Sequence, residues 1–73
     1  MTIRRLIYRL APDTYVRIRV LCVVEVTGKT GNSGTKNIMK KLRELDCDNA
    51  WVTCIRPLHH AEELYIECVI LVQ

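Results

Sequence analysis

Apolar side chains recur at every second position from Val16 to Val26, and this period of two constrains the fold more than any other feature of the chain. In an extended strand, alternate side chains lie on the same face. The pattern predicts one long strand from Tyr15 to Val26, whose second face starts with Arg17 and Arg19 and continues with apolar residues. The first face would carry Val16, Ile18, Val20, Cys22, Val24 and Val26.

Segments with helical periodicity lie on both sides of this strand. From Ile3 to Leu10 the apolar residues follow the spacing i, i+3, i+4 and i+7, with Thr2 placed to cap a helix and a proline shortly after it to end one. A second amphipathic helix is predicted to run to about Asp46, with Ser33 or Thr35 as its cap. Its apolar stripe would consist of Ile38, Met39, Leu42 and Leu45.

The C-terminal third predicts a β-hairpin. The runs "AWVTCIRP" and "ELYIECVILV" are strand-like, and "LHHAEE" joins them. The order helix, strand, helix, strand, strand predicts a single domain over residues 1–73 of the α/β (α+β) class: a small two-layer sandwich with a three-stranded sheet and both helices on one face.

The second face of this sheet is predicted to be apolar. An exposed patch of that kind is unusual for a monomer, so we expect a homodimer or larger homo-oligomer formed through this face or an edge strand. A chain of 73 residues also has a marginal core, which association would supplement. The predicted face consists of Tyr15, Leu21, Val23, Tyr65, Val69 and Leu71, with Trp51 added in some registers.

Composition limits the cellular location and the kinds of partner that we expect for this chain. No apolar run approaches the roughly 18 residues that span a bilayer, and the first ten residues do not have the pattern of a signal peptide, so we expect a protein of the cytoplasm. The four cysteines form no CxxC pair and are expected to be reduced core thiols, with no metal site. The net charge of +3 is concentrated in the first 24 residues, where five arginines face Asp13 alone, so an anionic partner would bind this half.

The segment "TGKTGNSGT", residues 27–35, is the candidate binding element. It is not a Walker loop, because Val23 occupies the position of the first glycine and the chain is too short for an NTPase sheet. The backbone amides of a glycine-rich turn that leads into a helix can bind an anion, with nearby lysines adding charge; the alternative is a surface connection that only needs glycine. The candidate ligand-binding residues are Arg17, Arg19, Lys29, Thr30, Gly31, Asn32, Ser33, Gly34, Thr35, Lys36 and Trp51.

Catalysis is not predicted. The single serine, Ser33, has no histidine near it in sequence, and the adjacent carboxylates Glu62 and Glu63 would point apart in a turn. We therefore expect neither an enzyme nor a cofactor.

The stretches "TIRRLIYRLAPDTYVRI", "SGTKNIMKKL", "WVTCIRP" and "LYIEC" together resemble a loose group of short proteins encoded in phages and prophages of Gram-positive bacteria. The resemblance implies a protein that acts against host defence. We expect a homo-oligomer that sequesters a nucleotide-derived immune signal, such as a cyclic oligonucleotide or a cyclic ADP-ribose type molecule. The alternatives are an anti-CRISPR-type inhibitor that binds a host defence complex, and a small nucleic-acid-binding protein.

Overall fold

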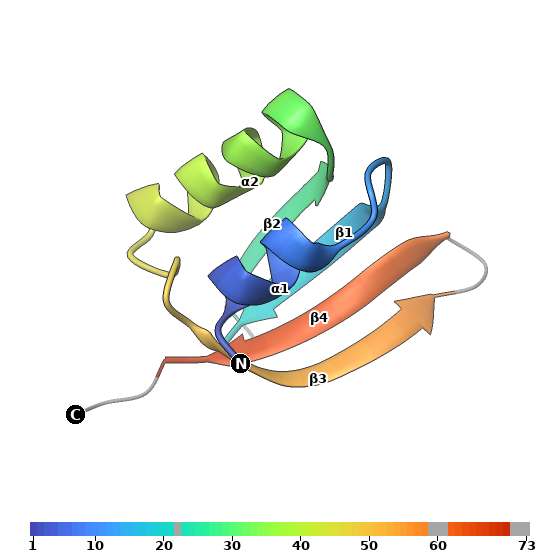
Figure 1. Cartoon of the computed structure of the whole chain (residues 1–73). Helices are drawn as coiled ribbons and strands as arrows, with labels where there is room; N and C mark the ends of the chain where they lie inside the picture. Colours follow the sequence, from blue (N-terminus) through green and yellow to red (C-terminus); the bar gives the residue numbers. More distant parts are fainter. Residues whose placement is uncertain (22, 59–61, 71–73) are drawn as a thin grey trace.

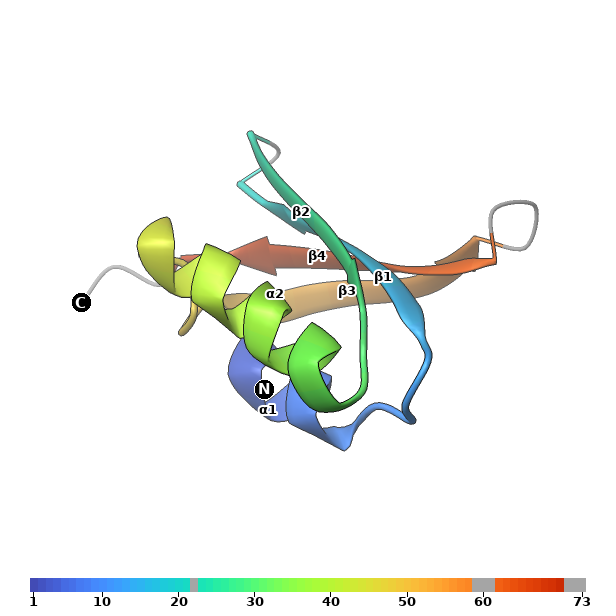
Figure 2. The ribbon, with the colours of Figure 1, turned by 90° about the horizontal axis from the view of Figure 1, so that it is seen from above.

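Two helices pack on one face of a four-stranded sheet in the part of the chain that the computed structural model describes, residues 1–21, 23–58 and 62–70 (Figures 1 and 2). The small α+β class and the placement of both helices are as predicted, but the order is helix, strand, strand, helix, strand, strand. The elements are α1 (Ile3–Arg9), β1 (Tyr15–Val20), β2 (Val24–Lys29), α2 (Asn32–Glu44), β3 (Trp51–Leu58) and β4 (Glu63–Val69).

The predicted long strand is wrong: the chain reverses between Val20 and Val24 and forms a hairpin. The amide of Val23 donates to the carbonyl of Val20 (3.1 Å), and Leu21 has a φ of 56°. Val20 pairs with Val24, so the two residues share a face of the sheet just as they would in one continuous strand. The period of two therefore passes through the turn unchanged, and no glycine, proline, asparagine or aspartate marks the reversal.

The sheet has the order β2-β1-β4-β3, with β1 and β4 parallel and the two outer pairs antiparallel. α2 carries the chain from β2 at one edge to β3 at the other edge, and β4 then returns to the centre beside β1 (Figure 1). The C-terminal hairpin is as predicted, although a bulge interrupts its register between Val52 and Cys54. No helix of the described residues is long and apolar enough to cross a membrane.

The helix starts follow from local hydrogen bonds. Thr2 caps α1 as predicted, since its side chain accepts a hydrogen bond from the amide of Arg5. The predicted cap of α2 is wrong, because the N-cap is Gly31, with a φ of 111° that favours glycine. The hydroxyl of Thr35 instead accepts from the Gly31 amide (2.9 Å), which fixes the first turn from inside the helix.

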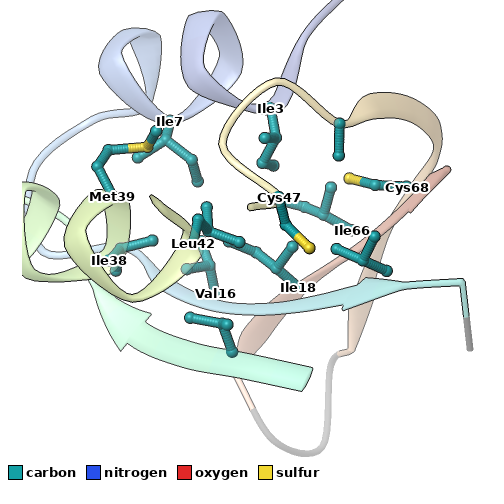
Figure 3. Close-up of a cluster of buried hydrophobic side chains, with 13 residues drawn as sticks. Ile3, Ile7, Val16, Ile18, Ile38, Met39, Leu42, Cys47, Ile66 and Cys68 are labelled. Atoms are coloured by element: carbon teal, nitrogen blue, oxygen red, sulfur yellow. The ribbon is translucent and has the colours of Figure 1, made fainter. Parts of the chain in front are cut away.

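The core fills the space between the helices and the sheet (Figure 3). Each of its large aliphatic side chains contributes about 1.5–3 kcal/mol through burial. The buried residues are Ile3, Ile7, Val16, Ile18, Val20, Val26, Ile38, Met39, Leu42, Cys47, Ala50, Ile66 and Cys68.

The opposite face of the sheet, here called the open face, is not the apolar patch that the sequence predicted. Its centre carries charged residues, because β2 folds back beside β1 and adds its own polar side chains where the long strand would have continued. Trp51, Tyr65 and Val69 lie on the open face with Tyr15, whereas Leu21 and Val23 lie in the hairpin turn at its end. Leu71 lies outside the described residues.

Candidate functional site at the start of α2

The glycine-rich segment is not a long loop. Residues 27–29 belong to β2, residues 32–35 form the first turn of α2, and Thr30 and Gly31 alone connect them. A surface pocket of about 410 Å³ lies at this junction. Its lining residues are Pro12, Asp13, Lys29, Thr30, Gly31, Asn32, Ser33 and Gly34.

Two of the glycines allow α2 to approach β2 closely. A Cβ atom on Gly34 would overlap the backbone carbonyl of Lys29, and one on Gly28 would lie 2.6 Å from Cγ1 of Ile38. Close packing of the helix on the strand thus explains both residues without a ligand.

The hydroxyl groups of this segment differ in their exposure and in their hydrogen-bond partners. Thr30 is 3% exposed; its hydroxyl donates to the carbonyl of Ala11 (2.6 Å) and accepts from the amide of Thr14 (3.0 Å). Thr35 is occupied by the Gly31 amide. Ser33, in contrast, is exposed and lines the pocket.

Residues of the first turn of α2 line this pocket, and their backbone amides are donors that have no acceptor within the helix. The amides of Asn32, Ser33 and Gly34 precede the first intrahelical bond, in which Thr35 donates to the Gly31 carbonyl (3.0 Å). The helix dipole adds partial positive charge at the same place. This arrangement is one to which an anion can bind.

The two candidate lysines do not converge. Lys29 lies at the pocket, 3.4 Å from the Asp13 carboxylate, with its ammonium group 5.4 Å from the centre of the Tyr15 ring. Lys36 lines a different hollow, between α1 and α2, together with Ile7 and Tyr8.

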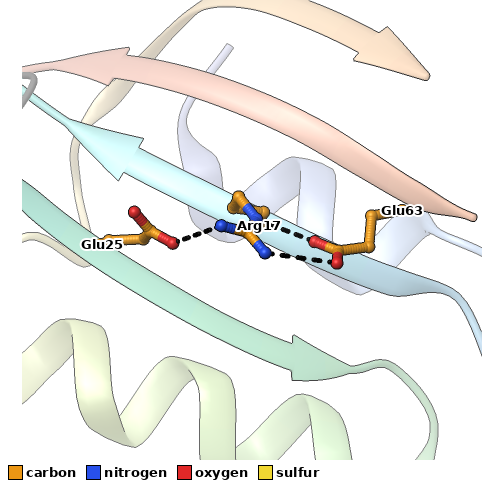
Figure 4. A network of polar contacts seen from close by, with 3 residues as sticks. All are labelled: Arg17, Glu25 and Glu63. Atoms are coloured by element: carbon orange, nitrogen blue, oxygen red, sulfur yellow. Dashed lines mark hydrogen bonds and ion pairs between the residues drawn. The ribbon is translucent and has the colours of Figure 1, made fainter. Parts of the chain in front are cut away.

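Arg17 and Arg19 lie on the open face and do not line the pocket at α2. Arg17 lines a second hollow of about 360 Å³, which it shares with Lys29 and Glu63. Arg17 donates to Glu25 (2.8 Å) and to Glu63 (2.9 Å), so two carboxylates neutralise it (Figure 4). The hydrogen bond from Arg17 lowers the pKa of Glu63, and the same bond raises the pKa of Arg17. Trp51 lies at the other end of the sheet, opposite Val69.

The structure therefore brings Lys29 to Gly34 together, with Thr35 in the same helical turn. Arg17 shares a second hollow with Lys29, whereas Arg19, Lys36 and Trp51 lie elsewhere.

Sequence reasoning missed Pro12 and Asp13 as pocket residues. They reach it because the amide of Asp13 donates to the Thr30 carbonyl (2.9 Å), a contact that depends on the unforeseen β1–β2 hairpin.

The cysteines that the structure describes are free thiols. Burial raises the pKa of Cys47, and it raises that of Cys68 to about 11, which keeps both thiols protonated and unreactive at neutral pH. Cys54 is half-buried, and Cys22 and both histidines lie outside the described residues. Among the described residues, no group of three or more histidine, cysteine or acidic side chains could hold a metal ion.

Comparisons with known proteins identify no relative of this chain. No protein-family model, no curated protein and no solved structure matches this chain.

Proposed function

We propose that this chain is a small non-enzymatic protein that binds and sequesters a phosphorylated, nucleotide-derived ligand in the pocket at the start of α2. One observation carries the proposal: the amides of Asn32, Ser33 and Gly34 and the ammonium group of Lys29 adjoin one pocket. A phosphate group there would receive several backbone hydrogen bonds and lie at the positive end of a helix of 13 residues.

Asp13 decides how strongly an anion binds. Its carboxylate is 3.4 Å from the Lys29 ammonium group and lines the same pocket, so a bound phosphate would compete with it for the lysine and be repelled by it. Asp13→Asn removes the competing charge, and asparagine tolerates the positive φ of 63° at this position. We expect this variant to bind the ligand more tightly than the wild type.

The ligand class follows from size and from the resemblance noted in the sequence. A pocket of about 410 Å³ is at the small end of the roughly 300–1,000 Å³ range of ligand pockets, which suits a phosphate and its attached sugar. The resemblance to phage proteins makes cyclic oligonucleotides and cyclic ADP-ribose type molecules the first compounds to test.

A thermal-shift panel of these compounds tests the proposal. A ligand present at 100 times its dissociation constant stabilises the fold by about 2.7 kcal/mol. Lys29→Ala should weaken binding and Asp13→Asn should strengthen it. Lys40→Ala, which removes an exposed lysine of α2 that does not line the pocket, should leave binding unchanged. The absence of any shift across the panel, or equal effects of the two lysine variants, would contradict this function.

A second candidate is inhibition of a host defence complex through α1. Arg5, Tyr8 and Arg9 are all exposed on this helix, and Tyr8 is 59% exposed. Arginine and tyrosine are enriched among the residues that dominate protein interfaces. In a pull-down with a purified defence nuclease, the double variant R5E/R9E should lose binding while Lys40→Glu retains it. Equal capture of both variants would exclude α1 as the binding surface.

A further inference from the structure

The open face of the sheet is a mixed surface rather than a uniformly charged one. Across its middle, Arg19 lies opposite Glu25 on β2 and opposite Glu67 on β4, so one cation lies between two anions. The neighbouring row contains Arg17, which Glu25 and Glu63 neutralise.

Lys29, opposite Tyr15, and Arg56, opposite Tyr65, add two further cations to this face. Because the cations alternate with the three carboxylates, the surface carries both signs of charge. Such a surface fits a protein partner better than a uniformly anionic nucleic-acid backbone.

Neither edge of the sheet is suited to pairing with another chain. At β3, the amide of Val52 already donates to the carbonyl of Met1 (2.9 Å), Pro57 has no amide hydrogen, and a bulge interrupts the strand. At the other edge, α2 runs along β2 in two views of the molecule (Figures 1 and 4). Association through the sheet is therefore expected at its open face.

We propose that two copies of this chain form a homodimer through their open faces, related by a two-fold axis that runs parallel to the strands and midway between β1 and β4. This axis places β1 of one copy over β4 of the other and leaves every residue at the same level along the strands. Arg19 of each copy then faces Glu67 of the second copy, which gives two opposite-charge pairs across the interface. Two sheets stacked with their strands aligned pack about 10 Å apart, a distance that these side chains can bridge.

The other aligned arrangement is not complementary. A two-fold axis perpendicular to the strands places β1 over β1 of the second copy. Arg17 and Arg19, the central open-face residues of β1, would then face the same arginines, and like charges facing one another across an interface are repelled. The charge pattern thus selects the axis parallel to the strands.

The same axis covers the aromatic and apolar side chains of the open face. Tyr15 is 52% exposed and Trp51 is 42% exposed, and Tyr65 and Val69 lie on β4 between their strands. Burying these side chains supplements a core that is small for an independent domain.

The dimer keeps both helices on its outer surfaces. Its interface adjoins the pocket at α2 through Lys29, whose ammonium group lies 5.4 Å from the centre of the Tyr15 ring. The pairs between Arg19 and Glu67, however, lie away from that pocket.

Native mass spectrometry of mixed charge variants tests this interface. The wild type should give a dimer of two 8.5 kDa chains. Arg19→Glu or Glu67→Arg alone should raise the dissociation constant at least about tenfold, because like charges then face one another. In a heterodimer of the two variants, each of the two pairs that face one another across the interface joins an acidic and a basic side chain. In either homodimer, both of these pairs carry like charges. Within each chain, the substituted residue still lies beside a residue of its own charge. The mixture should therefore form heterodimers in preference to either homodimer.

Lys40→Glu, on the outer surface of α2, is the control and should dimerise like the wild type. A monomeric wild type at the highest concentration measured, or a mixture without preferred heterodimers, would overturn the proposal. A failed ligand panel beside a confirmed heterodimer would reject the proposed ligand and keep the interface.

Discussion

Gly34→Ala tests whether the glycine-rich segment serves close packing. In most helices this change stabilises the protein by about 0.5–1 kcal/mol, because alanine restricts the unfolded chain. Here the added methyl group would overlap the backbone carbonyl of Lys29, which cannot rotate away as a flexible side chain can. Overpacking costs about 1–3 kcal/mol. With about 3 kcal/mol for a rigid neighbour and a gain of about 1 kcal/mol, we expect a net loss of about 2 kcal/mol in the free energy of unfolding.

Urea unfolding followed by far-UV circular dichroism and by the fluorescence of Trp51 measures this loss. For a domain of this size a loss of 1 kcal/mol lowers the melting temperature by roughly 4–8 °C, so we expect a decrease of roughly 8–16 °C. Ser33→Ala changes an exposed neighbour in the same turn and should stay within about 0.5 kcal/mol of the wild type. If Gly34→Ala is as stable as the wild type, α2 does not pack closely on β2 and the structural explanation of this glycine fails.

Two further changes probe polar contacts, one beside the pocket and one on the open face. Thr30→Val should lower stability by about 1–3 kcal/mol in urea titrations, because the carbonyl of Ala11 and the amide of Thr14 lose their partner, whereas Thr30→Ser should stay close to the wild type. The pKa of Glu63 is lowered in the folded state, so its bond with Arg17 stabilises the fold above the unfolded pKa of about 4.3 and is lost as the pH falls through the lower folded value. The urea midpoint of the wild type should therefore fall more than that of Glu63→Gln between pH 6 and pH 3, and parallel curves would contradict this.

Patterns within single segments could be predicted from the sequence. The stripe from Ile3 to Leu10 identified α1, and the two C-terminal runs identified the hairpin of β3 and β4. The β1–β2 hairpin could not be predicted, because residues paired across a turn keep the alternation of a continuous strand and Leu21 adopts a positive φ without the usual turn residues. That single reversal added a fourth strand.

The candidate site was only partly predictable for the same reason. Residues 29–34 are contiguous, so their meeting at one pocket follows from the chain itself. Arg17 was expected to contact a ligand, but its partners Glu25 and Glu63 come from strands whose pairing depends on the hairpin. Sequence spacing shows the charge of a residue but not the charges opposite it in a sheet.

The hairpin also changes which surface of the sheet this chain could bury by associating with a partner. A continuous strand would have offered an apolar face, which buries against almost any hydrophobic surface with little choice of partner. The observed open face places Arg19 between two carboxylates. Tyr15 and Trp51 lie toward its ends, and Tyr65 lies beside Arg17 in the charged part. Binding of such a surface to a partner with unmatched charges gains little free energy, because each charged group that is desolvated on binding must be paired with an opposite charge. In the proposed dimer, the second copy would add one more opposite charge to Arg19 and to Glu67, and this would make self-association selective as well as stabilising.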